Sequence, residues 1–292
     1  MNILFIHPSY PGQFLYLAYD LAQNPDNNVY FLAEDNGIGG AKLKNVKMGI
    51  YAKTKEDEAQ AAKAACSAME STILAHLEGR NVLRALDYLT SKEKFMPDIV
   101  IGHTGWGSMM YVKDFYKGYN RDMPVLGYFE WYYRSENSDA FWWPDEQAGI
   151  GSRVANRNKN IALWLSYEGC DQGLVPTKWQ YSKFPKEFQS KPHIIHEGID
   201  TDFCSPLPER PGLELHTEEI DLELAQGTEI LTYLSRGFEA YRGFPQFMDA
   251  MRIVLEKRPQ CHVVIAGSDR VVYGKQLKEK SYKIIEEEKG GY

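Results

Sequence analysis

The stretch "NILFIHPSYPGQFLYLAYDLAQNPDNNVYFLA", residues 2–33, contains the alternation that decides the fold. Its two short apolar runs, Asn2–Ile6 and Asn28–Ala33, are typical of buried strands. Between them, residues 12–23 place apolar side chains at helical spacing, at Phe14, Leu17, Ala18 and Leu21. A strand, a helix and a second strand in this order predict a β-α-β unit and a parallel sheet.

The same alternation continues along the first two thirds of the chain. Thr54 can cap a long helix, and Gly79 is expected to separate it from a second helix that runs through Leu89. Further strands are expected at Val46–Ala52, Asp98–His103, Pro124–Glu130, Gln172–Thr177 and His193–Asp200. We therefore predict an α/β fold in which residues 1–207 form a Rossmann-like domain with a parallel sheet.

A change of composition follows this first domain. Residues 208–227 contain prolines and many acidic residues without a clear period, and we expect a linker or an exposed excursion there. The α/β pattern restarts at residue 228, with a strand, a helix that begins near Pro245, the strand His262–Gly267 and a charged helix. Residues 228–292 are therefore expected to be the start of a second, incomplete Rossmann-like domain, because two strands are few for a sheet.

Composition excludes several classes of protein. The net charge of -7 argues against a nucleic-acid-binding protein, which needs a basic excess to neutralise phosphates. The four cysteines are far apart and lack metal-ligand spacing, which favours reduced thiols in a cytoplasmic protein. Neither a signal peptide nor an apolar run long enough to span a bilayer is expected. Cations beside aromatic residues in residues 111–121 leave peripheral contact with the inner face of a membrane open.

Two arginines, Arg236 and Arg242, lie where a predicted strand is followed by a helix. A helix N-terminus offers unpaired N–H groups and the positive end of the helix dipole. Two guanidinium groups at such a place would make a site for a phosphate or diphosphate. The alternative is that both are solvated surface arginines.

The loop after the first strand, "HPSYPGQF", offers a second candidate contact with a ligand. Gly12 opens the first helix, and a glycine there lets the backbone approach a ligand closely. A dinucleotide-binding fingerprint needs three glycines at fixed spacing, and this loop has one. The glycines of Asn36–Lys42 have the wrong spacing and predict a flexible loop, so a nicotinamide-dependent dehydrogenase is disfavoured.

Polar side chains end two other predicted strands. His103 comes at the end of "DIVIGH", and Glu130 ends "PVLGYFE", with Tyr132 two residues later. Ligands bind at the carboxyl ends of parallel strands, so these three residues are candidates for a site. Tyr132 and its aromatic neighbours fit core packing as well, and a lone histidine is often structural.

Two acidic spacings resemble functional motifs without their context. Asp200 and Asp202 have a D-x-D spacing but lie at the exit from the first domain, where a turn is expected. Glu279 and Glu287 lie in a charged segment that is typical of a solvated helix face. We expect no metal ion and no cofactor.

Seven segments together resemble the retaining, nucleotide-sugar-dependent glycosyltransferases of family 4, which have the GT-B fold of two Rossmann-like domains. In the first domain they are "NILFIHPSYPGQF", "IGHTGWGSMMYVKDFY", "LGYFEWYYR", "GLVPTKWQYSKFP" and "IIHEGIDTDFCSP". In the second they are "YLSRGFEAYRGFPQFMDAM" and "HVVIAGSDRVVYG". The resemblance covers nearly the whole chain.

The resemblance implies a role for each matching position. Gly12, Arg236 and Arg242 would contact the diphosphate of the sugar donor, and His103 would lie beside the transferred sugar as the catalytic residue. Gly267 and Ser268 would lie near the nucleotide base. Glu130 and Tyr132 are candidates for binding the acceptor, a glycan or a lipid-linked sugar of the kind used in polysaccharide biosynthesis.

One feature of the family has no counterpart in this chain. The family's second domain has two glutamates separated by seven residues in a loop-to-helix context, beyond the part that matches residues 228–292. The resemblance therefore implies a truncated transferase, and we expect little or no sugar transfer by this chain alone. A non-catalytic sugar- or nucleotide-binding module is the alternative, and a sugar-nucleotide epimerase of the same fold is a third reading.

Overall fold

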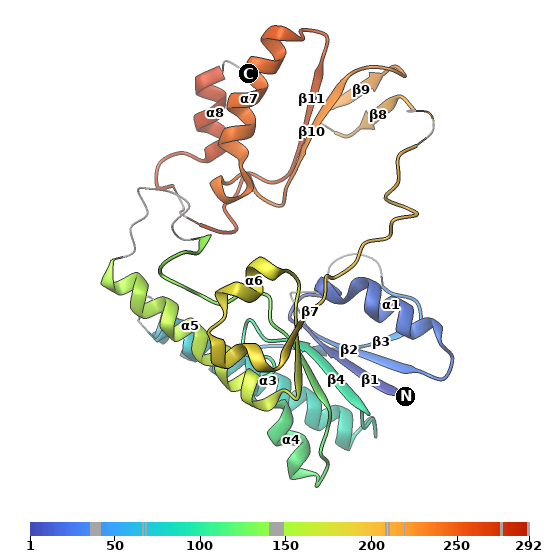
Figure 1. Ribbon diagram of the computed structural model, residues 1–292, viewed down its shortest axis with the longest axis vertical. Helices are drawn as coiled ribbons and strands as arrows, with labels where there is room; N and C mark the ends of the chain where they lie inside the picture. The colour runs from blue at the N-terminus through green and yellow to red at the C-terminus, as the bar shows by residue number, and fades with distance from the viewer. Residues whose placement is uncertain are drawn as a thin grey trace. The chain divides into compact units, whose positions relative to one another are not determined.

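The computed structural model describes residues 1–35, 42–65, 67, 69–139, 149–207, 209, 211–218, 220–274 and 277–290. It divides into two compact units, Met1–Cys204 and Ser205–Tyr292, which we call unit 1 and unit 2 (Figure 1). Most of the segment Asn36–Lys42, for which a flexible loop was predicted, lies outside the described residues.

Unit 1 is built on a seven-stranded sheet with the order β3-β2-β1-β4-β5-β6-β7. All neighbouring strands pair in parallel, as the β-α-β pattern predicts. The strands are β1 (Asn2–Ile6), β2 (Asn28–Glu34), β3 (Val46–Tyr51), β4 (Ile99–His103), β5 (Val125–Tyr128), β6 (Gln172–Val175) and β7 (Pro192–Ile194). The chain runs outward from β1 to β3 and returns beside β1 with β4, so the order reverses between β1 and β4.

Helices cover both faces of this sheet (Figure 1). One face packs against α3 (Glu70–Ser91), α4 (Val112–Gly118) and α5 (Ile150–Gly169), in a core that includes Leu4, Leu86 and Leu163. The other face packs against α1 (Leu15–Gln23) through Phe5, Phe31 and Ala18. The central strands are apolar on both faces for this reason. The shorter elements are η1 (Gly12–Phe14), α2 (Lys55–Ala64), α6 (Lys178–Lys183) and η4 (Lys186–Ser190).

The prediction that Gly79 separates two helices is wrong. Helix α2 begins after Thr54, whose hydroxyl accepts the N–H of Asp57 at 3.1 Å as predicted, but it ends at Ala64. Helix α3 then runs without a break through Gly79. The glycine is needed for packing, because a Cβ atom there would lie 2.8 Å from the ring of Tyr111.

The last predicted strand of unit 1 is shorter than expected. Strand β7 ends at Ile194, and the residues up to Asp200 are not a strand. The turn predicted at the D-x-D spacing is confirmed, since Oδ1 of Asp200 accepts the N–H groups of Asp202 and Phe203 at 3.1 and 2.9 Å.

Unit 2 contains a two-stranded parallel sheet of β10 (Ile230–Leu234) and β11 (His262–Ala266). Helix α7 (Phe244–Lys257) follows β10 after the 3-10 turn η5 (Ala240–Arg242), and α8 (Tyr282–Gly290) comes last. Residues 208–227, expected to be a linker or excursion, contain an antiparallel pair, β8 (Leu213–His216) and β9 (Asp221–Leu224). Alternating apolar residues in both strands explain the pairing.

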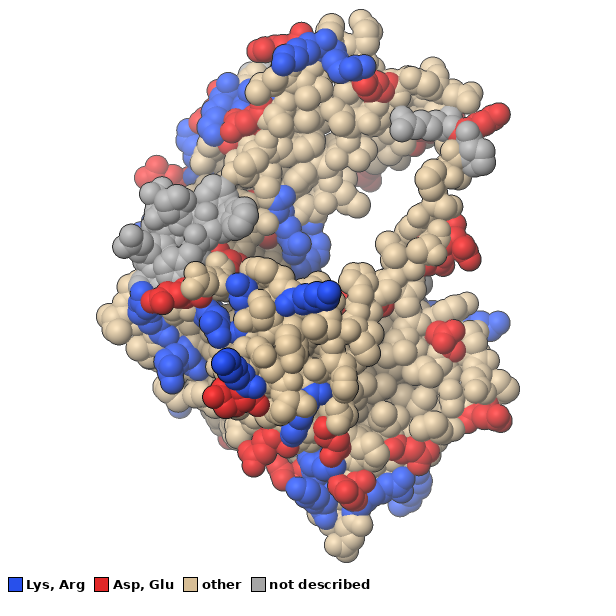
Figure 2. Space-filling model, in the orientation of Figure 1, with Lys and Arg blue, Asp and Glu red and all other residues tan. Residues whose placement is uncertain are grey.

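Charged side chains of both signs lie on the surface of the molecule (Figure 2). Acidic and basic side chains are interspersed on the visible face of the molecule (Figure 2). Within residues 111–121, Lys113 is buried and pairs with Asp122 and Asp171, and Arg121 pairs with Asp98. In the described ranges, no helix has the length and apolar character that crossing a membrane requires.

The packing of Gly79 predicts an unusual effect of Gly79→Ala. Alanine normally stabilises a helix interior by about 1 kcal/mol relative to glycine. Here the added methyl group would meet Tyr111 and, at 3.1 Å, the carbonyl oxygen of Gly107, so we expect a loss of about 1–3 kcal/mol instead. Urea unfolding followed by tryptophan fluorescence measures it, because all 6 tryptophans belong to unit 1.

Gly118→Ala is the matched control, because a Cβ atom at Gly118 would have no neighbour within 4 Å. This variant should be neutral or slightly stabilised. Equal stability of the two variants would contradict the packing that we assign to Gly79.

Candidate functional site

The carboxyl ends of three neighbouring strands bring four polar side chains together in unit 1. His7 follows β1, His103 ends β4, and Glu130 lies two residues after β5. Gln13 comes from η1, directly after the first loop. The register that pairs Ile6 with Gly102 places His7 beside His103, with ring centroids 5.0 Å apart. This is the point where the strand order reverses, the usual place for a ligand in an open parallel sheet.

Hydrogen bonds fix the direction of the two imidazole rings. The backbone N–H of Gly105 donates to Nδ1 of His103 at 3.0 Å, which leaves Nε2 to donate to Oε2 of Glu130 at 3.1 Å. His7 is held in the same way: its Nδ1 accepts the N–H of Ser9 at 2.8 Å, and its Nε2 lies 2.7 Å from Oε1 of Gln13. Both rings therefore have one defined tautomer.

Gln13 joins the two halves of this network. Its side-chain NH₂ group donates to Oε2 of Glu130 at 3.1 Å, so one carboxylate oxygen accepts from both Gln13 and His103. The Glu130 side chain is 38% exposed, whereas that of His103 is 2% exposed. A ligand hydroxyl would therefore meet the carboxylate first, with the imidazole behind it.

Close packing holds the histidines in place. The ring of Trp106 stacks on His103 with centroids 4.4 Å apart, and it meets His7 edge-on. Gly12 has a φ of +51, and a Cβ atom there would lie 2.7 Å from the His7 ring. A glycine is required at position 12 for both reasons. The structure thus places Gly12 against His7, at the entrance to helix α1.

The pKa values of His7 and Glu130 are both lowered, but for different reasons. Burial, together with the neighbouring His103, lowers the pKa of His7 to about 4, so this histidine is neutral at pH 7. The hydrogen bond from His103 is the main cause that holds the pKa of Glu130 below its usual value, against the effect of burial. The site therefore contains a neutral imidazole beside an ionised carboxylate.

The structure separates the two residues predicted to bind an acceptor. Glu130 lies in the His103 network, and its backbone carbonyl also accepts from Gln180 at 2.9 Å. Tyr132 packs its ring against Phe184, with centroids 5.5 Å apart, and its hydroxyl accepts from Nε1 of Trp164. Tyr132 thus contributes to packing, and its contact with an acceptor stays a prediction.

Unit 2 brings Arg236 and Arg242 together, as the sequence predicts for an anion site. They line a cavity of about 490 Å³ with Leu234 and Ser235, at the carboxyl end of β10. Both guanidinium groups lie 5.7 Å from the centroid of the Tyr273 ring. Helix α7 begins directly after Gly243, but the N–H of Phe244 donates to the carbonyl oxygen of Glu239 at 3.3 Å, and Pro245 has no N–H. The two arginines are therefore the charged groups that line the cavity.

A buried carboxylate supports this cavity. Glu239 is fully buried, and its Oε2 accepts the backbone N–H groups of Val272 and Tyr273, the second at 2.9 Å. Its Oε1 lies 3.5 Å from Nε of Arg242. Glu239 therefore fixes the loop that carries Tyr273 by hydrogen bonds, whereas its contact with Arg242 is a long ion pair without a hydrogen bond.

The residues predicted near a nucleotide base come directly after the neighbouring strand, β11. Gly267 and Ser268 follow β11, and the carbonyl oxygen of Ser268 accepts the N–H of Phe238 at 3.1 Å. A Cβ atom at Gly267 would lie 2.4 Å from the carbonyl oxygen of Ser235. Both residues thus pack on the loop that follows β10, the loop of Arg236.

Four residues at these two places were not predicted from the sequence: His7, Gln13, Glu239 and Tyr273. His7 follows a predicted strand, so the reasoning that selected His103 could have selected it too. Gln13 and Glu239 had no comparable signal, because their roles depend on partners distant in the sequence.

The described cysteines are free, with Cys170 and Cys261 buried and Cys204 exposed, while Cys66 lies outside the described residues.

These features define the class of the protein. Unit 1 is a Rossmann-like domain with polar residues at its topological switch point, and unit 2 begins a second α/β sheet with two arginines after its first strand. The fold is GT-B-like, the architecture of glycosyltransferases and related sugar-nucleotide enzymes.

The family follows from a direct match. The model of the glycosyl transferase family 4 group matches residues 25–204, more than half of the chain, and the protein belongs to this family. No curated protein matches the sequence.

Solved structures show the same fold at low sequence identity. An Escherichia coli structure described as trehalose-6-phosphate bound with UDP-2-fluoro glucose matches with a TM-score of 0.52 and 10% identity. The match covers 92% of this chain and 65% of that chain. A structure described as OtsA without ligand matches with a TM-score of 0.53 and 10% identity, over 92% and 66%. The chain thus spans about two thirds of the length of these structures.

The low pKa of His7 predicts a loss of stability in acid. The unfolded chain, in which histidine titrates near 6.5, binds more protons than the folded chain between pH 6.5 and 4. Stability from this group is therefore present above pH 6.5 and is lost as the pH falls toward 4. Between pH 7 and pH 5 we expect unit 1 to lose about 2 kcal/mol from this group.

Urea unfolding at both pH values, followed by tryptophan fluorescence, measures this loss. His7→Asn should reduce the difference between the two pH values. His193→Asn, which replaces an exposed histidine bonded to Gln172, should leave it unchanged. The same pH dependence in all three proteins would show that His7 is not the group responsible.

Proposed function

We propose that the whole protein transfers a sugar from a nucleoside-diphosphate sugar to an acceptor. The observation that carries this proposal is the cavity of unit 2, which Arg236 and Arg242 line at the carboxyl end of β10. Two guanidinium groups at one cavity suit a diphosphate, which carries two negative groups in sequence. Membership of family 4 and the sugar nucleotide named for the similar E. coli structure support a donor such as a UDP-sugar.

Charge stabilisation is the catalytic contribution that we propose for unit 2. When the bond to the sugar breaks, negative charge builds on the departing diphosphate. Arg236 and Arg242 would stabilise this charge without a metal ion, because two guanidinium groups at one cavity supply the positive charge. Gly267 and Ser268, on the neighbouring loop, would face the nucleotide base.

Unit 1 would supply the sugar and acceptor contacts. His103 has a fixed tautomer and lies behind Glu130, so the pair can hold hydroxyl groups of the transferred sugar or of the acceptor. Gly12, packed on His7, would let the first loop approach the donor diphosphate. We propose transfer with retention of the anomeric configuration, on the basis of the resemblance. The acceptor would be a glycan or a lipid-linked sugar, the latter at the inner face of the membrane.

A non-catalytic sugar-nucleotide-binding module is the second candidate. The arginine cavity alone would serve it, whereas the His103–Glu130 pair would have no chemical role. His103→Ala, made in the whole protein, separates the two functions: for a transferase it should abolish sugar transfer and leave UDP affinity unchanged.

The proposed role of Arg236 can be tested by binding. Arg236→Gln should weaken the binding of UDP about tenfold, because a charge-assisted hydrogen bond contributes about 1.5–3 kcal/mol. Isothermal titration calorimetry with UDP measures the dissociation constant.

Arg258→Gln is the matched control in the same unit. Arg258 is exposed and pairs with Glu229, and it does not line the cavity. Unchanged UDP affinity in Arg236→Gln, or an equal loss in both variants, would remove Arg236 from the donor site.

A further inference from the structure

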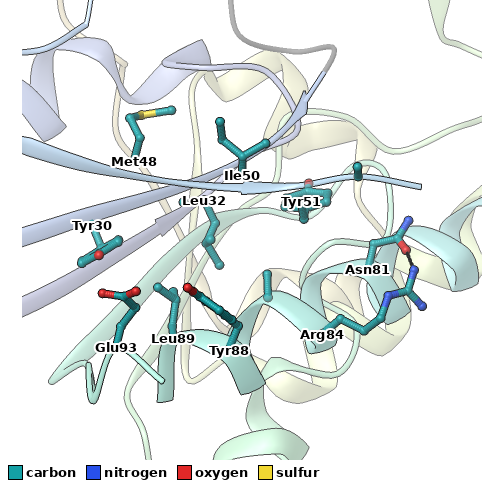
Figure 3. A pocket seen from close by; sticks show the side chains of 13 residues that line it. Tyr30, Leu32, Met48, Ile50, Tyr51, Asn81, Arg84, Tyr88, Leu89 and Glu93 are labelled. Atoms are coloured by element: carbon teal, nitrogen blue, oxygen red, sulfur yellow. Dashed lines mark hydrogen bonds between the residues drawn. The ribbon is translucent and has the colours of Figure 1, made fainter. Parts of the chain in front are cut away.

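A second cavity, of about 480 Å³, lies in unit 1 between the edge of the sheet and helix α3 (Figure 3). Strands β2 and β3 form one wall, with Leu32 among the contributing residues, and the last turns of α3 form the other. None of the residues of the His103 network lines it. Its volume is in the range of sites for small molecules.

At one end of the cavity, Arg84 is held by hydrogen bonds to other side chains. The Nη2 group of Arg84 donates to Oδ2 of Asp57 at 2.6 Å and also donates to Oδ1 of Asn81. The Asp57 carboxylate is fully buried and is itself fixed by Thr54, whose hydroxyl donates to it at 2.7 Å. This arrangement orients the guanidinium group in advance, which lowers the entropy cost of binding a ligand.

Arg84 still has donors for a ligand. Its side chain is 42% exposed, and within the described ranges its Nε and Nη1 groups have no hydrogen-bond partner. A guanidinium group presents only donors, so the matching ligand group is an acceptor with negative charge, such as a carboxylate, sulfonate or phosphate.

Between its two ends the cavity has apolar as well as polar lining and can hold an apolar body. Leu32, Ala85 and Leu89 line it between its ends, together with the ring of Tyr88. Figure 3 shows Glu93 and Tyr30 at the end opposite Arg84. The carboxylate of Glu93 disfavours a second negative group at that end, so a ligand would carry its charge at one end only.

We propose that this cavity is a binding site for a small amphipathic anion, with its acidic group on Arg84 and its aromatic or aliphatic body between α3 and the β2–β3 edge. The site is separate from the proposed donor site in unit 2, and its occupation does not depend on sugar transfer. Arg84, held by Asp57 and Asn81, would recognise the charge, and the apolar wall would recognise the body.

The probe is 8-anilinonaphthalene-1-sulfonate, whose fluorescence rises in an apolar site, compared with its uncharged analogue N-phenyl-1-naphthylamine. Arg84→Gln should weaken the sulfonate probe about tenfold, or about 1.4 kcal/mol, and leave the uncharged probe nearly unchanged. Arg80→Gln is the matched control, because Arg80 lies one turn earlier on α3 and does not line the cavity. Ala85→Leu, which fills the cavity, should weaken both probes.

Circular dichroism and thermal unfolding show whether each variant is folded. The proposal is overturned if Arg84→Gln affects both probes equally, if Arg80→Gln has the same effect as Arg84→Gln, or if Ala85→Leu changes neither titration. Unchanged UDP binding in the Arg84 variant would show that the two sites are independent. If the UDP titrations contradicted the proposed donor site, the probe titrations would still test the cavity beside α3.

Discussion

The parallel pairing of β1 with β4 is the contact on which the architecture of unit 1 depends. Parallel neighbours need crossover connections, so β2 and β3 extend the sheet on one side of this pair, while β5, β6 and β7 extend it on the other. The carboxyl ends of these parallel strands lie along one edge of the sheet, and the crossovers from β1 and from β4 leave in opposite directions. The space between them receives His7 and His103, which are 96 residues apart in the numbering but adjacent in the sheet.

Carboxylates contact nitrogen donors at three places where the described part of this protein offers polar groups to a ligand. Glu130 accepts from His103, Glu239 pairs with Arg242, and Asp57 accepts from Arg84. In the last two pairs the carboxylate is fully buried and the arginine is partly exposed. Each such carboxylate costs desolvation energy, which hydrogen bonds offset only in part, because Oδ1 of Asp57 and Oε1 of Glu239 are buried without a hydrogen-bond partner among the described residues. In the His103 and Arg84 pairs, a hydrogen bond sets the direction of the donor before a ligand arrives.

The two units contribute different chemistry. Unit 1 offers a neutral histidine and an ionised glutamate, which suit hydroxyl groups, while unit 2 offers two cations, which suit phosphates. A sugar nucleotide carries both kinds of group. The family match and the polar groups within each unit are separate observations, and both are consistent with a sugar nucleotide as ligand.

The sequence by itself determined the alternation of strands and helices, the α/β class and the positions of His103, Arg236 and Arg242 at element ends. These features depend on local periodicity, which a chain shows without its partners. Only the tertiary structure decided that Gly79 lies inside one helix, that Glu130 bonds His103, and that Tyr132 packs among Phe184 and Phe188. Contacts between residues far apart in the sequence set these outcomes, and no local pattern encodes which side chain meets which.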